Sequence, residues 1–189
     1  MSRPRTANSR RSRRIDVGIA EPFRKELSAV WIEKVATEAL QSALPEGEPG
    51  QVSLLVADDE TLRDLNRKFR GLDEVTDVLS FSSSHPGHWE GEAVASKERF
   101  STTEDTELSP FILPPGELPV VGEVVISYPQ AKRQARDRNQ PADRELALLI
   151  VHGVLHLVGH DHVDPEQASR MQAIEMDTLS VVFRGEGKE

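Results

Sequence analysis

One stretch, residues 152–162 with the sequence HGVLHLVGHDH, constrains the fold of this chain more than any other. His152 and His156 are four residues apart, and positions i and i+4 lie one turn apart on the same face of a helix. Two imidazoles can therefore point at one place. Gly159 can end such a helix, because glycine takes the left-handed conformation without a Cβ penalty. The chain can then turn back and bring His162 to the same place.

Three converging imidazoles predict an open metal site. Three protein nitrogens leave a fourth position for water, which is typical of catalytic zinc. A closed structural zinc site would normally use cysteine, and the chain contains none. We therefore expect one Zn²⁺ ion on His152, His156 and His162. The identity of the metal is an expectation, since imidazole also suits copper, iron and nickel.

The alternative to metal binding is that these histidines are ordinary core residues. Residues 146–158 are nearly all apolar, which predicts a helix that is buried on every side. Burying two imidazoles there without a ligand would leave polar nitrogens to satisfy, so the spacing favours a metal. Asp161 could orient one ligand histidine. His160 is interpreted either as a group outside the ligand shell or as an exposed residue.

A zinc peptidase or amidohydrolase is one alternative function. The spacing HxxxHxxGxxH is also that of the metzincin proteases, in which a glutamate directly after the first histidine is the general base. Here that position is Gly153, which cannot accept a proton. Glu145 lies two helical turns before His152, too far to replace that glutamate easily.

Residues 152–162 resemble the signature HGxLHLxGYDH of the YbeY family. Two further stretches support the resemblance. Residues 65–70 (LNRKFR) and 76–81 (TDVLSF) are similar to the family's LNxxYR and TDVLSF segments, and residues 122–127 (GEVVIS) are similar to its GD/E-I-x-IS strand. The resemblance extends over about residues 15–182. His160 replaces the usual tyrosine, which leaves the ligand histidines unchanged.

The resemblance implies a function. YbeY proteins are bacterial zinc-dependent endoribonucleases linked to ribosomal RNA maturation. It follows that this chain is expected to be a single-strand-specific endoribonuclease in the cytoplasm. Its partners would be precursor ribosomal RNA and ribosomal subunit proteins or assembly factors. The remaining alternative is a non-catalytic assembly factor that uses zinc only for stability.

The same resemblance implies two catalytic residues, His152 and Arg70. Arg70 occupies the family's Tyr-Arg position, and its planar guanidinium suits bidentate contact with the scissile phosphate. The structural alternative for Arg70 is a salt bridge to one of the many carboxylates. Asp77 and Ser80 could line the cleft or could satisfy nearby backbone groups. The general base is left open.

Charge divides the chain into a basic arm and an acidic body. The net charge is −9, yet residues 1–14 hold six arginines and no acid, so the rest carries about −15. We expect a disordered arm at 1–14 that either contacts RNA phosphates or has no role. The absence of cysteine is consistent with a reducing cytoplasm. No apolar run is long enough for a membrane span, and no signal peptide follows the arginines.

Periodicity predicts a single α+β domain over residues 15–183, with a frayed tail at 184–189. We expect a small mixed four-stranded sheet packed against helices, one of which is buried and carries the metal-binding histidines. The segment 82–118 is expected to be a long acidic loop insertion without a second metal site. Met171 and Met176 are predicted to be core residues, and Phe69 is predicted on the inner face of the helix near 58–69. Strands are expected near 15–19, 52–56, 78–81 and 119–126, and helices near 27–40, 58–69, 130–138, 141–158 and 164–179.

Overall fold

A mixed four-stranded sheet forms the centre of the computed structural model, which describes residues 13–85, 117–162 and 164–184. The strand order is β1-β2-β4-β3. β1 and β4 both run parallel to β2, and β3 runs antiparallel to β4 at one edge. The predicted mixed sheet is therefore confirmed. The strands are β1 (Arg13–Ile19), β2 (Gly50–Ala57), β3 (Val78–Ser82) and β4 (Val120–Ser127).

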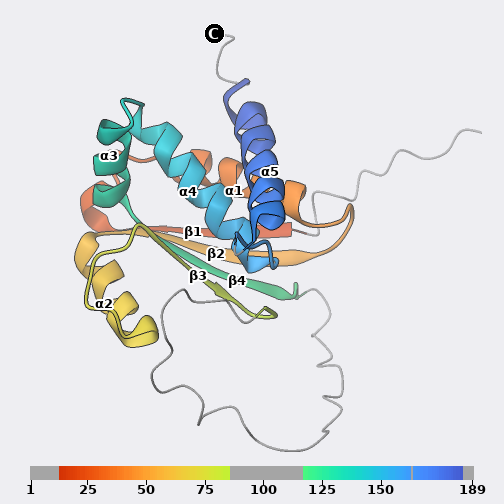
Figure 1. Ribbon diagram of the computed structural model, residues 1–189, viewed down its shortest axis with the longest axis horizontal. Helices are drawn as coiled ribbons and strands as arrows, with labels where there is room; N and C mark the ends of the chain where they lie inside the picture. Colours follow the sequence, from red (N-terminus) through yellow and green to blue (C-terminus); the bar gives the residue numbers. More distant parts are fainter. Residues whose placement is uncertain (1–12, 86–116, 163, 185–189) are drawn as a thin grey trace, which may run out of the picture.

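The helices form two unequal layers on this sheet (Figure 1). One face is covered by three of them, α1, α4 and α5, with α3 at one end of that layer. On the other face, the one helix in the described part of the chain is α2, next to β3 and β4. The arrangement agrees with the predicted α+β domain. The bounds are α1 (Ala29–Ala43), α2 (Asp59–Arg70), α3 (Tyr128–Asp137), α4 (Ala142–Leu157) and α5 (Pro165–Arg184), with a short 3-10 helix at Glu21–Phe23.

Alternation along β4 builds two separate hydrophobic cores. Val124 and Ile126 point into the large core beneath α1 and α4. Val125 points the other way and packs with Leu62 of α2 and Leu79 of β3 in a smaller cluster. Side chains alternate between the two faces of a strand, so a central strand needs apolar residues at successive positions.

The helix α4 lies inside the larger core, where it packs on β3 and β4 of the sheet and against its neighbouring helices α1, α3 and α5. Its burial on nearly every side confirms the prediction from its all-apolar sequence. The two histidines are only half-buried, at positions where the helix surface opens. Ten of its residues are fully buried: Glu145, Leu146, Ala147, Leu149, Ile150, Val151, Gly153, Val154, Leu155 and Leu157.

Local signals in the sequence place the helix ends. Asp58 caps α2 by accepting a hydrogen bond from the Thr61 amide at 2.9 Å, and Gly71 ends that helix in the left-handed conformation. Asp164 accepts hydrogen bonds from the amides at the start of α5. Pro141 precedes α4 as expected.

Two residues predicted to face the core are exposed. Met176 is 65% exposed because it lies two residues before the buried Thr178, and two residues turn a helix through about 200°. Phe69, predicted on the inner face of α2, is 51% exposed at the last turn of that helix. Its ring instead contacts Phe81 of β3 edge to face, at 5.0 Å between centroids.

The described residues include only part of the predicted basic arm (1–14) and of the predicted insertion (82–118). β1 begins at Arg13, so Arg13 and Arg14 lie in the sheet and not in the predicted arm. The Arg13 guanidinium donates to backbone carbonyls at the end of α1, including that of Leu40 at 3.2 Å. Residues 1–12, 86–116 and 185–189 lie outside the described residues. None of the helices in the described ranges is long and apolar enough to cross a membrane.

Candidate metal centre

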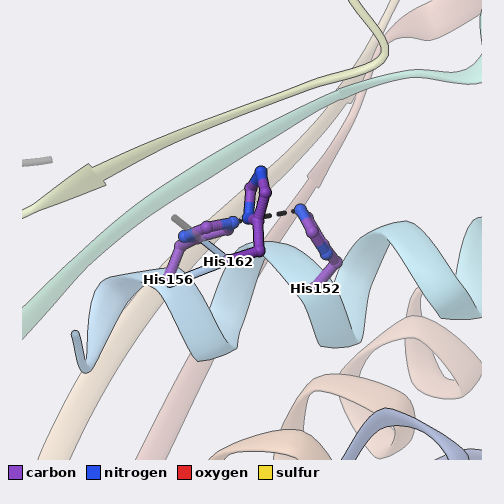
Figure 2. A group of neighbouring side chains, drawn as sticks. All are labelled: His152, His156 and His162. Atoms are coloured by element: carbon purple, nitrogen blue, oxygen red, sulfur yellow. Dashed lines mark hydrogen bonds between the residues drawn. The ribbon is translucent and has the colours of Figure 1, made fainter. Parts of the chain in front are cut away.

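The helical spacing of His152 and His156 brings two ring nitrogens together. Their Nε2 atoms are 3.0 Å apart, on the same face of α4, and the ring centroids are 4.5 Å apart (Figure 2). This contact follows from the i, i+4 spacing, which places the two side chains one turn apart. The sequence-based prediction that the two imidazoles point at one place is confirmed.

The third imidazole reaches the group after the end of α4. The helix ends at Leu157, and Gly159 takes a φ of +87°, the left-handed region that turns the chain back. His162 then lies with its ring centroid 5.2 Å from that of His156 and 5.7 Å from that of His152. Figure 2 shows the three rings gathered above α4. One ligand nitrogen from each of the three lies within 4.8 Å of the others.

These distances fit a divalent ion bound by imidazole. Zinc–nitrogen bonds of about 2.0–2.1 Å in a tetrahedron place two nitrogens about 3.3 Å apart. The two Nε2 atoms on α4 are already close to this separation, at 3.0 Å. His162 is the more distant ligand and lies on an exposed turn, so it is the residue that must approach. Within the described part of the chain, this group contains three histidines and no carboxylate.

The electrostatics of the group favour neutral rings. Burial, and then the neighbouring His152 and His162, lower the pKa of His156 to about 4. A ring with this pKa is uncharged at neutral pH and keeps a lone pair for a metal. Burial also lowers the pKa of His160, but that half-buried ring lies outside the three-histidine group.

A carboxylate from α5 contacts the first ligand, and reasoning from the sequence missed it. The Oε1 atom of Glu175 lies 2.8 Å from Nδ1 of His152. The Glu175 side chain is only 14% exposed. The two residues are 23 positions apart in different helices, so no local spacing predicts the contact. Asp161, predicted from the sequence to orient a ligand histidine, accepts a hydrogen bond at its Oδ1 from the amide of His162, and this oxygen lies 3.7 Å from Nδ1 of His162.

Gly153, which stands where the metzincin proteases have their glutamate base, faces the sheet. A Cβ atom added to Gly153 would lie 2.6 Å from Cγ1 of Val124 and 3.2 Å from Oγ of Ser80. A glutamate at this position would therefore collide with β4. Glu145, the other candidate base, is fully buried and is bound by Arg138 at 2.6 Å and by Gln140. Neither position supplies a carboxylate to the histidines.

Arg70 and the histidine group come from helices on opposite faces of the sheet. Arg70 is half-buried in the last turn of α2, and α2 packs on the face opposite α4. The edge strand β3 separates the two. Ser80 of this strand donates to the Gly153 carbonyl of α4 at 3.1 Å, while its neighbour Phe81 contacts Phe69 of α2. The structure thus brings the three predicted ligands together, whereas Arg70 comes from α2, on the other side of β3 from α4.

Two other candidates from the sequence make hydrogen bonds that join neighbouring elements of the fold. Asp77 accepts hydrogen bonds from the amide of Val78 and from Nε2 of Gln134, both at 2.8 Å. Ser80 donates to α4 as described above. These contacts support the structural alternative for both residues. Of the two histidines in the predicted insertion, His85 packs its ring against Gly159, and residue 88 lies outside the described ranges.

The chain is thus an α+β domain in which three histidines lie together, two from one buried helix and one from the turn after it. This arrangement is that of a metal-binding protein. A family model described as "Endoribonuclease YbeY" matches residues 19–182. The chain therefore belongs to the YbeY endoribonuclease family, whose members act in ribosomal RNA maturation.

Relatives from several bacteria support this assignment, each named "Endoribonuclease YbeY". The protein from Dehalococcoides mccartyi is 39% identical over 150 residues, covering 78% of this chain and 77% of its own. The relative from Heliobacterium modesticaldum is 34% identical, over 84% of this chain and 85% of its own. The Roseiflexus sp. protein is 32% identical, over 88% and 91%.

A solved structure shows the same fold. The solution structure of TM1509 from Thermotoga maritima superposes with a TM-score of 0.52, covering 92% of this chain and 90% of that one. Because the two sequences are only 19% identical, this likeness supports the fold alone.

Proposed function

We propose that this chain is a zinc-dependent endoribonuclease that cleaves single-stranded RNA during ribosomal RNA maturation. The observation that carries the proposal is the group of His152, His156 and His162, with ligand nitrogens within 4.8 Å of one another and no carboxylate among them. One zinc ion held there would act as a Lewis acid and lower the pKa of a bound water. Family membership supports RNA as the substrate.

The proposed role of the chain's own residues is to hold the ion and to position the phosphate. His152 and His156 present their Nε2 atoms from one rigid helix, and His162 completes the set from a turn. Arg70, from the last turn of α2, would bind the phosphate, because its guanidinium can make two parallel hydrogen bonds. An RNA strand that crosses the edge of the sheet at β3 would contact both Arg70 and the histidines.

The geometry favours phosphodiester over peptide hydrolysis. A metzincin-like peptidase needs a carboxylate base directly after the first ligand histidine. In this chain the space that a side chain at position 153 would need is occupied by Val124. Net charge does not oppose an RNA substrate, because the local field of a divalent ion and nearby cations matters more at the site than the total of −9. The proposed partners are precursor ribosomal RNA and proteins of the ribosomal subunits, in the cytoplasm.

The test compares substrates and variants of the full chain. Zinc-loaded wild type should cleave single-stranded ribosomal RNA fragments and leave casein-type peptides intact. His156→Ala should lose zinc and RNA cleavage together. Arg70→Ala should keep zinc and lose most cleavage, whereas the control Arg63→Ala, on the same helix and paired with Asp73 at 2.8 Å, should stay active.

Three results would contradict parts of this account. Cleavage of peptides instead of RNA would favour the amidohydrolase alternative. RNA binding without cleavage at any zinc loading would favour a non-catalytic assembly factor. Full RNA cleavage by a stably folded Arg70→Ala would remove Arg70 from the site.

A further inference from the structure

Within the described residues, the carboxylate of Glu175 has one polar partner, and that partner is a proposed metal ligand. Its Oε1 atom lies 2.8 Å from Nδ1 of His152, and among the described residues no lysine or arginine pairs with it. The side chain extends from α5 towards α4 and is largely shielded from water. A carboxylate in such a place needs a hydrogen-bond donor, because burying an ionised carboxylate without a partner is strongly unfavourable.

The direction of this hydrogen bond determines the state of the His152 ring. An ionised carboxylate can only accept, so the ring proton must be on Nδ1 and be donated to Glu175. In the neutral ring, the lone pair is then on Nε2. This atom is the one that faces Nε2 of His156 at 3.0 Å. The contact therefore selects the tautomer that can bind a metal at the three-histidine group.

We propose that Glu175 is a positioning residue for the metal centre, which fixes the tautomer and the orientation of the His152 ring. The inference rests on the proposed metal-binding function and deepens it, because it makes the last helix part of the centre. Carboxylates that accept from the second nitrogen of a ligand histidine raise its basicity and hold its ring in place. α5 thereby contributes to metal affinity without supplying a ligand.

The first experiment measures zinc affinity of the full chain by competition with a chromophoric chelator. Glu175→Ala should weaken zinc binding by about 10–100-fold, the usual effect of removing such a partner. Glu175→Gln should be intermediate, because its amide oxygen still accepts one hydrogen bond but carries no charge. The control Glu166→Gln, on the same helix in an exposed pair with Arg170, should bind like wild type.

The second experiment reads the ring directly. Nitrogen NMR of the metal-free chain, ¹⁵N-labelled at histidine, should show the Nδ1–H tautomer of His152 in wild type and a shift towards Nε2–H in Glu175→Ala. A purely structural role would lower the melting temperature of the metal-free chain and leave both the tautomer and the zinc affinity unchanged.

The outcomes separate this proposal from the function on which it rests. Wild-type zinc affinity in Glu175→Ala, or an Nε2–H tautomer in wild type, would overturn the positioning role while the three-histidine centre stands. If Glu175→Ala and His156→Ala both bind zinc like wild type, the positioning role and the three-histidine centre are both overturned.

Discussion

At the residue scale, the behaviour of the centre depends on how its imidazoles are surrounded. His156 contributes its Nε2 atom from a buried helix, and burial lowers its pKa to about 4. His152 is held from its other side by Glu175. The ligand set follows from sequence spacing, but these surroundings do not, because burial and the α5 carboxylate both arise from tertiary packing.

The lowered pKa of His156 predicts how the stability of the metal-free chain varies with pH. The unfolded state binds a proton near the ordinary value of 6.5, and the folded state binds it only near 4. Stability from this residue is therefore fully present above the unfolded pKa and is lost as the pH falls from 6.5 towards 4. Melting temperatures of chelator-treated protein should fall more steeply over this range in wild type than in His156→Leu. Parallel pH profiles for the two proteins would contradict the lowered pKa of His156.

At the element scale, the turn after α4 decides whether the third ligand reaches the centre. Gly159 has a φ of +87°, and a Cβ atom there would lie 2.8 Å from Cδ2 of His85. His85 itself is held by its amide, which donates to Oγ of Ser82 at 3.0 Å. The glycine could be predicted from the sequence as a helix end. Its contact with His85 could not be predicted, because His85 lies in the segment that follows β3, far from Gly159 in the sequence.

Replacing Gly159 with alanine should therefore weaken both the fold and the metal site. The left-handed conformation alone costs about 1–2 kcal/mol for a residue with a Cβ, and the collision with His85 adds to it. Gly47→Ala is a matched control, since Gly47 has a φ of +84° and open space around its Cβ position. Urea unfolding should show a larger loss for Gly159→Ala, and only this variant should bind zinc more weakly. Equal losses in both variants, with unchanged zinc affinity, would show that the turn does not position His162.

At the scale of the whole molecule, the individual helices and strands could be predicted from the sequence, but their arrangement in layers could not. The apolar periods and capping residues such as Asp58 predict the individual elements, because their causes are local. The order β1-β2-β4-β3 and the position of α2 on the opposite face depend on long-range packing. For this reason the spacing of the histidines predicts that they lie together, whereas no local pattern predicts that β3 lies between α4 and α2, the helix that carries Arg70.

This arrangement predicts that Arg70 and the metal centre contribute separately to RNA binding. Each neutralised phosphate on a single strand changes the slope of log affinity against log salt by about 0.7. Arg70→Ala should reduce the slope by roughly that amount, while Arg63→Ala should leave it unchanged, because Arg63, which pairs with Asp73, is not part of the proposed RNA contact. Fluorescence anisotropy with a single-stranded RNA oligomer, over a salt series, measures both slopes. An unchanged slope in Arg70→Ala would mean that Arg70 makes no phosphate contact.

The most direct test of the metal centre is anomalous diffraction at the zinc edge, from crystals of the full chain purified without a chelator. We expect a single peak bonded to imidazole nitrogens of His152, His156 and His162, with no fourth ligand from a protein side chain. Three rings turned away from one another in the crystal, or a further side chain filling the remaining position, would contradict the proposed open site.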